Sequence, residues 1–122
     1  MSTPARGRSL VLPGETAAVY AERIFGGRTQ IVEARVTIGT TVTQLLAGNP
    51  KRIFWMAVNN AVNAGSLGFA PALTATTGIV MGPSGGFASM EVFVDGEGVS
   101  WAVYAIQSVA AGIWYTTEVM QL

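Results

Sequence analysis

Side chains able to perform acid–base chemistry are scarce in this sequence. Its 122 residues include seven carboxylates, three tyrosines and one lysine, but neither histidine nor cysteine. The chain therefore lacks the commonest general base, the commonest metal ligand, thiolate nucleophiles and disulfides. Its serines have no histidine to activate them. We expect no catalytic residues, no metal site and no cofactor, and we expect a protein that is not an enzyme.

Two pairs of carboxylates come nearest to a reactive arrangement. Asp95 and Glu97 stand in the stretch Asp-Gly-Glu-Gly, which indicates a water-exposed turn with too few oxygens for calcium. Glu91 and Glu118 would have to face each other across a cleft to act as the carboxylates of a glycosidase. Like charges directly opposite each other destabilise a sheet, so we expect these two not to pair. The glycine-rich GIVMGPSGG lacks the Gly-Lys-Ser/Thr of a phosphate loop and indicates a turn.

The elements that would position these groups are short strands. After residue 30 the hydrophobic period is two, and turns rich in Gly, Asn and Pro interrupt it. This pattern predicts an all-β fold, an antiparallel β-sandwich of jelly-roll or Ig-like type with about seven strands. We place the strands at residues 31–38, 41–47, 52–60, 66–73, 87–96, 101–109 and 113–122. Residues 79–81 would be a further extended piece within a loop, and Pro71 favours an edge position for strand 66–73.

The strand 52–60 is apolar on both faces. Phe54, Met56 and Val58 point one way, and the other face carries Ile53, Trp55 and Ala57. A strand of this kind is covered on both sides. We expect the second sheet on one side and a neighbouring subunit on the other. Only 11% of the residues are charged, which also favours a chain that buries surface against copies of itself or a partner.

The first 29 residues differ from the rest. We divide the chain into an N-terminal arm, residues 1–29, and a β-sandwich domain, residues 30–122. The stretch ETAAVYAERIFGG favours a short helix over residues 16–25, which Gly26 and Gly27 would end. An extended arm lying on a partner fits the same residues equally well. No signal peptide and no apolar run of membrane-spanning length occurs, so we expect no membrane partner.

The charges are distributed unevenly. Residues 1–52 hold seven cations and three carboxylates, a net charge of +4, whereas residues 53–122 hold four carboxylates and no cation. Such a charge asymmetry within one chain gives information about the partners that the protein binds. The isoelectric point near 6.2 does not suit nucleic acid, so we expect an acidic protein surface as the partner. The candidate partner-binding residues are Arg6, Arg8, Arg23, Arg28, Lys51 and Arg52.

Aromatic side chains give a second set of candidates. Most of them lie within alternating strands, which favours the core or a subunit interface over a platform for stacking sugars. We assign four to an oligomer interface: Trp55, Trp101, Tyr104 and Trp114.

Residues 36–122 resemble a small β-module of structural proteins in tailed-phage virions. The resemblance rests on TIGTTVTQLLAGNPKR, VNN, GSLGFAP, TGIVMGPSGG, MEVFVDG and WAVYAI, with LLAGNPKR as its sharpest part. It implies a capsid decoration or cement protein on the outer capsid surface, bound to the major capsid protein as a homo-oligomer, for which we expect a trimer. The alternative is a receptor- or glycan-binding module of a fibre, head fibre or baseplate, with the aromatics and loop 74–86 contacting glycan.

Overall fold

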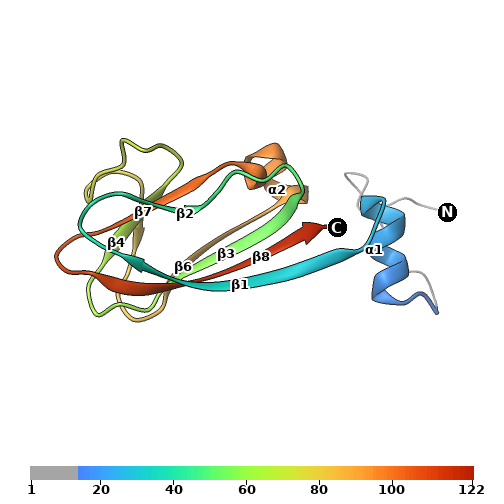
Figure 1. Ribbon diagram of the computed structural model, residues 1–122, viewed down its shortest axis with the longest axis horizontal. Helices are drawn as coiled ribbons and strands as arrows, with labels where there is room; N and C mark the ends of the chain where they lie inside the picture. Colours follow the sequence, from blue (N-terminus) through green and yellow to red (C-terminus); the bar gives the residue numbers. More distant parts are fainter. Residues whose placement is uncertain (1–13) are drawn as a thin grey trace.

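The computed structural model describes residues 14–122, which form a β-sandwich of eight strands in two antiparallel sheets (Figure 1). The predicted all-β fold class is confirmed, with one strand more than expected. Sheet A has the order β1 (Thr29–Ile38), β8 (Gly112–Gln121), β3 (Arg52–Asn59) and β6 (Gly86–Glu91). Sheet B has the order β2 (Thr43–Leu46), β7 (Val103–Gln107), β4 (Gly65–Gly68) and β5 (Ile79–Met81).

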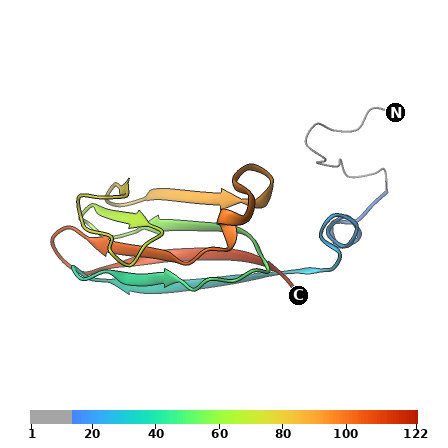
Figure 2. The ribbon, with the colours of Figure 1, turned by 90° about the horizontal axis from the view of Figure 1, so that it is seen from above.

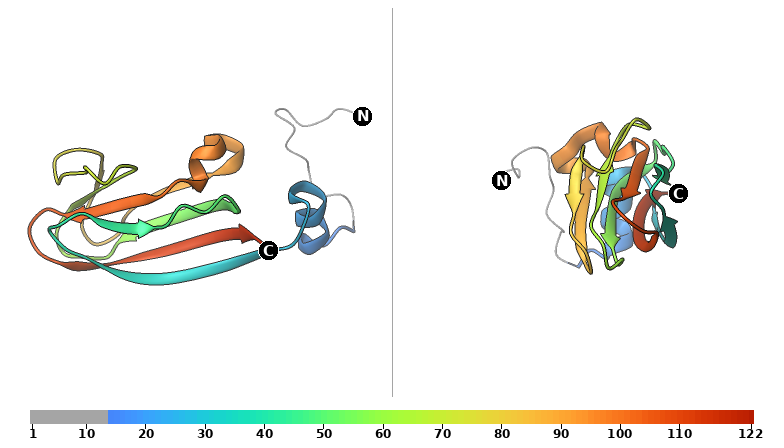
Figure 3. Two further views of the ribbon diagram at one scale, coloured as in Figure 1. Left: turned by 45° about the horizontal axis from the view of Figure 1, so that its top comes forward. Right: turned by 90° about the vertical axis from the view of Figure 1, so that its left-hand side faces the viewer.

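This strand order is that of a jelly roll: each strand is followed by a strand of the other sheet, except that β4 and β5 are neighbours in sheet B. Figure 1 shows sheet B as the upper layer and sheet A as the lower one, and the turned views of Figures 2 and 3 show the strands running along the length of the molecule. The first strand pairs with the last over ten residues, from Thr29 opposite Gln121 to Ile38 opposite Gly112. The N-terminal and C-terminal parts of the sandwich are therefore tied together in sheet A.

The core fills the space between the sheets. It consists of apolar residues whose alternation points them inward, and the two largest are Trp55 and Trp114. Around them pack Ile38, Leu45, Leu46, Ala57, Leu67, Met81, Val99, Val103 and Ala105. Close packing around the two indoles also explains a glycine. A Cβ on Gly65 would lie 2.6 Å from the Ile106 carbonyl oxygen and 2.8 Å from Cζ2 of Trp114.

The segment before β1 is helical. Helix α1 (Ala17–Phe25) begins where the Thr16 hydroxyl accepts a hydrogen bond from the Val19 amide, and it ends at Gly26, whose φ of 76° suits glycine. Of the two conformations that the sequence left open, the helix is the one present. It lies beyond the end of the sandwich, near the C-terminus (Figures 1 and 2). Gln121 Nε2 attaches it by a 2.8 Å hydrogen bond to the Phe25 carbonyl.

Two predictions about strands are wrong. The strand expected at residues 87–96 ends at Glu91, and helix α2 (Val92–Asp95) and the 3-10 helix η2 (Gly96–Ser100) follow. The Asp95 carboxylate turns back to accept a hydrogen bond from the Glu91 amide at 2.9 Å, which favours a turn of helix over alternation. The strand around residue 66 is not at an edge, because β4 lies between β7 and β5, and Pro71 falls in the loop after β4 ends at Gly68.

Within residues 14–122, no helix combines the length and the apolar character needed to cross a bilayer.

Candidate interaction surface

One face of sheet A has no second layer over it. On β3 the side chains of Trp55 and Ala57 point into the core, so Phe54, Met56 and Val58 point away from it. Within residues 14–122, sheet B covers the inner face of sheet A, and no other strand or helix packs across the outer one. The predicted two-faced character of this strand is therefore present, with the opposite sheet on one side.

The strand register extends this apolar centre across all four strands of sheet A. Val119 lies beside Phe54, and Tyr115 lies beside Val58. At the two edges Ile31 of β1 and Phe87 of β6 are each 67% exposed. We call this surface the outer face; its apolar members are Ile31, Phe54, Met56, Val58, Phe87, Tyr115 and Val119.

Polar groups border the outer face and fix its tyrosine. The Tyr115 hydroxyl donates a short hydrogen bond to the Glu33 carboxylate and accepts one from the Thr117 hydroxyl at 2.7 Å. Arg35, on β1, lies opposite Tyr115, and Glu91, on β6, lies opposite Phe54. Apolar side chains stand on both sides of the middle row, in which Met56 lies between Thr117 and Ser89, and the charges stand on the two edge strands. An apolar patch with a polar rim is the usual anatomy of a protein–protein contact.

Two residues assigned to an oligomer interface are core residues instead. Trp55 is 1% exposed and Trp114 is fully buried. The Trp114 indole donates a 2.8 Å hydrogen bond from Nε1 to Gln107 Oε1, whereas Nε1 of Trp55 is buried without a hydrogen-bond partner. For Trp55 the reason is that the sequence shows two apolar faces on β3 but not which of them meets the second sheet. Half-buried Tyr104 lies on β7, in the other sheet.

Arg52 is also misplaced as a partner-binding residue. Its side chain is buried, with Nε donating to the Val99 carbonyl at 2.9 Å and Nη1 donating to the Ala47 carbonyl at 2.9 Å. Nη1 also forms an ion pair with Glu118 at 2.7 Å, and Nη2 donates to the Trp101 carbonyl. The guanidinium thus joins two segments, the loop after β2 and the segment of η2 with Trp101, to strand β8, and it is not available to a partner.

Apart from Arg35 on β1, the exposed cations of residues 14–122 lie at the end of the sandwich that carries α1. Arg28 and Lys51 are exposed, and their carbonyls accept hydrogen bonds from the amides of Leu122 and Gln121 at the end of β8. Arg23 of α1 makes a bidentate ion pair with Glu15, and this hydrogen bonding raises the pKa of the guanidinium above its ordinary value. We call Arg28 and Lys51 the basic end. Arg6 and Arg8 lie outside the described residues.

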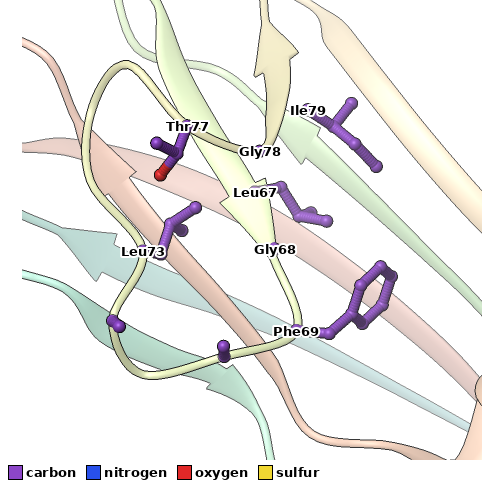
Figure 4. Close-up of a pocket in the computed structure, with 9 residues that line it drawn as sticks. Leu67, Gly68, Phe69, Leu73, Thr77, Gly78 and Ile79 are labelled. Atoms are coloured by element: carbon purple, nitrogen blue, oxygen red, sulfur yellow. The ribbon is translucent and has the colours of Figure 1, made fainter.

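A second surface feature is aromatic. Trp101 is 53% exposed, and the ring of Phe69 meets it edge to face, with centroids 6.4 Å apart. Beside them, the loop after β4 bends over the outer side of sheet B and encloses an apolar hollow of about 330 Å³ (Figure 4). The hollow is lined by Leu67, Gly68, Phe69, Ala70, Ala72, Leu73, Thr77, Gly78 and Ile79.

The carboxylates are separated in space. Glu118 is held by Arg52, and Asp95 bonds to the Glu91 amide. Glu91 and Glu118 lie on the two strands that flank β3 and are not paired with each other. Among residues 14–122, no three acidic side chains come together in a way that could hold a metal ion.

Comparison with known proteins adds little to this geometry. No protein-family model matches the chain, and no curated protein is significantly similar to it. Among solved structures, a chain from the study "Bacillus endospore appendages form a novel family of disulfide-linked pili" is 20% identical with a TM-score of 0.42. The alignment covers 79% of this chain and 92% of that one. The likeness is distant and carries no argument about function. None of these comparisons points to a phage virion protein.

Proposed function

We propose that this chain is a structural protein of a tailed-phage virion, a decoration or cement protein that binds the major capsid protein on the outer capsid surface. The observation that carries the proposal is the outer face of sheet A, an apolar surface with a charged border and no cover within the described chain. A protein whose work is adhesion needs such a surface and needs no assembled acid–base site.

The mechanism is burial of this face against the capsid. Removal of apolar surface from water supplies the attraction, at roughly 25 cal/mol per Å², and much of it is offset by the entropy lost on association. The face is rigid because its side chains stand on four paired strands, so little conformational entropy is lost there on binding. Many copies on one shell add avidity.

The basic end orients the protein. Arg28 and Lys51 are exposed at the same end of the sandwich, where they would meet acidic residues of the capsid. Contacts between exposed charges are screened by salt, so they affect orientation and association rate more than final affinity.

Co-sedimentation tests the proposal. Purified protein is mixed with capsid shells of the encoding virus that were assembled without it, and the shells are pelleted. We expect saturable binding, weakened by salt and by the combined changes Arg28→Glu and Lys51→Glu. A protein that stays in the supernatant at every concentration would remove the proposed function.

A glycan-binding module of a fibre or baseplate is the second candidate. The exposed indole of Trp101 beside Phe69 favours it, because sugars stack on exposed aromatic rings. The jelly roll occurs in both capsid and lectin domains, so the fold does not choose between the two. Calorimetric titration with host-surface glycans decides. Binding that Trp101→Ala abolishes supports this candidate, and no binding of any glycan removes it.

A further inference from the structure

The four edge strands of the sandwich differ in how well they resist pairing with another chain. An exposed edge is a template for a new strand unless it is short, bulged or interrupted. β5 has three residues, β2 has four with a register shift between Gln44 and Leu46, and β6 has six before α2 begins. β1 has ten residues, pairs with β8 without a register shift, and contains neither proline nor lysine. Within residues 14–122, no strand pairs with its other side. We call this side of β1 the open edge.

The residues of β1 are self-complementary about Ala34. If a second β1 runs antiparallel with the two Ala34 residues opposite each other, Glu33 lies opposite Arg35 of the second copy, and Arg35 lies opposite its Glu33. In the same register Val32 faces Val36. Charged residues therefore meet opposite charges and the two valines meet each other, while Ile31 and Ile38 lie opposite Thr37 and Gln30.

Neighbouring registers lose this complementarity. If the pair is centred on Glu33, two glutamates lie directly opposite each other, and if it is centred on Arg35, two arginines do. Like charges directly opposite each other destabilise a sheet. Centring the pair between two residues places outward residues of one copy opposite inward residues of the other, so the core side of one copy would continue as the outer side of its partner. The Ala34 register keeps the inward side of β1, with Val32 and Val36, continuous with the inward side of its copy.

Among residues 14–122, no strand or helix lies along the open edge. Helix α1 extends past the end of β1 and does not lie alongside the strand (Figures 1 and 2). In an antiparallel pair the two α1 helices would lie beyond opposite ends of the joined sheet, away from the two-fold axis at Ala34.

We propose that two copies of this chain pair through their open edges, antiparallel and in the Ala34 register, to form one eight-stranded sheet across a two-fold axis. The contact is isologous, so it closes as a dimer. It places the two outer faces side by side on one surface and doubles the area offered to a partner. It needs no partner and holds whether or not the protein decorates a capsid. A trimer, as the resemblance implies, would need a different contact.

Charge exchange at the open edge tests the pairing. The mass of the purified protein is measured by sedimentation equilibrium over a range of concentrations. We expect a dimer for the native chain and a rise of roughly tenfold or more in the dimer dissociation constant for Glu33→Arg or Arg35→Glu, since each change opposes like charges. The combined change Glu33→Arg with Arg35→Glu restores opposite charges and should restore the dimer. Glu97→Lys, a charge reversal at an exposed position of η2 and away from β1, should leave it unchanged.

Cross-linking gives a second reading that leaves these charges intact. The chain has no cysteine, so one introduced cysteine reports alone. Ala34→Cys would face its own copy at about 4.5–5.5 Å between Cα atoms, within disulfide range. Gln30→Cys, on the same side of the strand, would stand ~27 Å from its copy, eight residues at about 3.4 Å each. We expect oxidation to link Ala34→Cys into a covalent dimer and to leave Gln30→Cys unlinked.

Several results would overturn the pairing. A monomer at all concentrations, a trimer, a combined charge exchange that fails to restore the dimer, or cross-linking of Gln30→Cys in place of Ala34→Cys each contradicts it. Circular dichroism and melting curves check that every variant is folded. Because the cross-linking experiment retains Glu33 and Arg35, it decides the matter even if a charge variant unfolds.

Discussion

Arg52 and Glu118 form an ion pair of 2.7 Å at one end of the sandwich, and the arginine side chain of the pair is fully enclosed. Arg52 opens β3, and Glu118 lies near the end of β8, so the contact joins neighbouring central strands of sheet A. The guanidinium also satisfies carbonyls of Ala47, Val99 and Trp101, in the segments that enclose this end of the core. A cation that looks like a surface residue in the sequence is therefore a structural residue.

The first prediction compares adjacent cations. Arg52→Ala leaves Glu118 and three carbonyls without their donor, so we expect a loss of about 3–5 kcal/mol in the free energy of unfolding. Lys51→Ala removes an exposed side chain and should change it by no more than about 0.5 kcal/mol. Urea unfolding of the two variants measures the difference. Equal losses of stability in the two variants would show that the Arg52 side chain does not hold these segments together.

How far the sequence predicts this molecule depends on whether a signal is local. Alternation and turn residues locate the strands, including the three extended residues Ile79–Met81, because backbone period and turn chemistry are local properties. Residues 92–95 alternate as a strand does, but the side chain of Asp95 binds the Glu91 amide and the chain turns into a helix. Local period fails where one side-chain hydrogen bond selects another conformation.

The candidate surface needed tertiary information. The alternation of β3 shows two apolar faces, yet only sheet pairing shows that Trp55 faces sheet B and Met56 faces outward. In the same way, the burial of Arg52 depends on carbonyls up to 49 residues away in the chain. The sequence does contain one signal for the burial of Arg52. It is a cation at the start of an apolar strand, and no later cation is present to pair with the carboxylates that follow it.

The second prediction concerns the three tryptophans. Trp55 and Trp114 are buried, and Trp101 is 53% exposed, so acrylamide should quench only part of the native fluorescence. Trp101→Phe should remove the quenchable part and leave emission typical of buried indoles. Phe is a conservative control for folding because it keeps an aromatic ring beside Phe69. Strong quenching that persists in Trp101→Phe would contradict the burial of Trp55 and Trp114 in the core.

The third prediction concerns a close approach in sheet B. Gly65→Ala would place a Cβ 2.6 Å from the Ile106 carbonyl oxygen and 2.7 Å from Gln107 Oε1, both in the adjacent β7. We expect a loss of about 1–3 kcal/mol, since the neighbours are backbone and packed side chains that cannot move freely. Gly39→Ala is the matched control, because nothing lies within 4 Å of the added Cβ. Thermal unfolding measures both; a Gly65 variant as stable as the Gly39 variant would contradict this packing.

The outer face of sheet A is the central claim, and one measurement tests it most directly. Met56→Glu places a charge at its apolar centre, and Gln44→Glu places the same charge on an exposed strand position of sheet B. Both variants are mixed with shells that lack the protein, and bound protein is quantified after sedimentation. We predict that Met56→Glu lowers the affinity for the shells by roughly tenfold or more, because an apolar side chain at the centre of the contact is lost. Gln44→Glu should bind as the native chain does. Equal binding of the two variants would contradict the account.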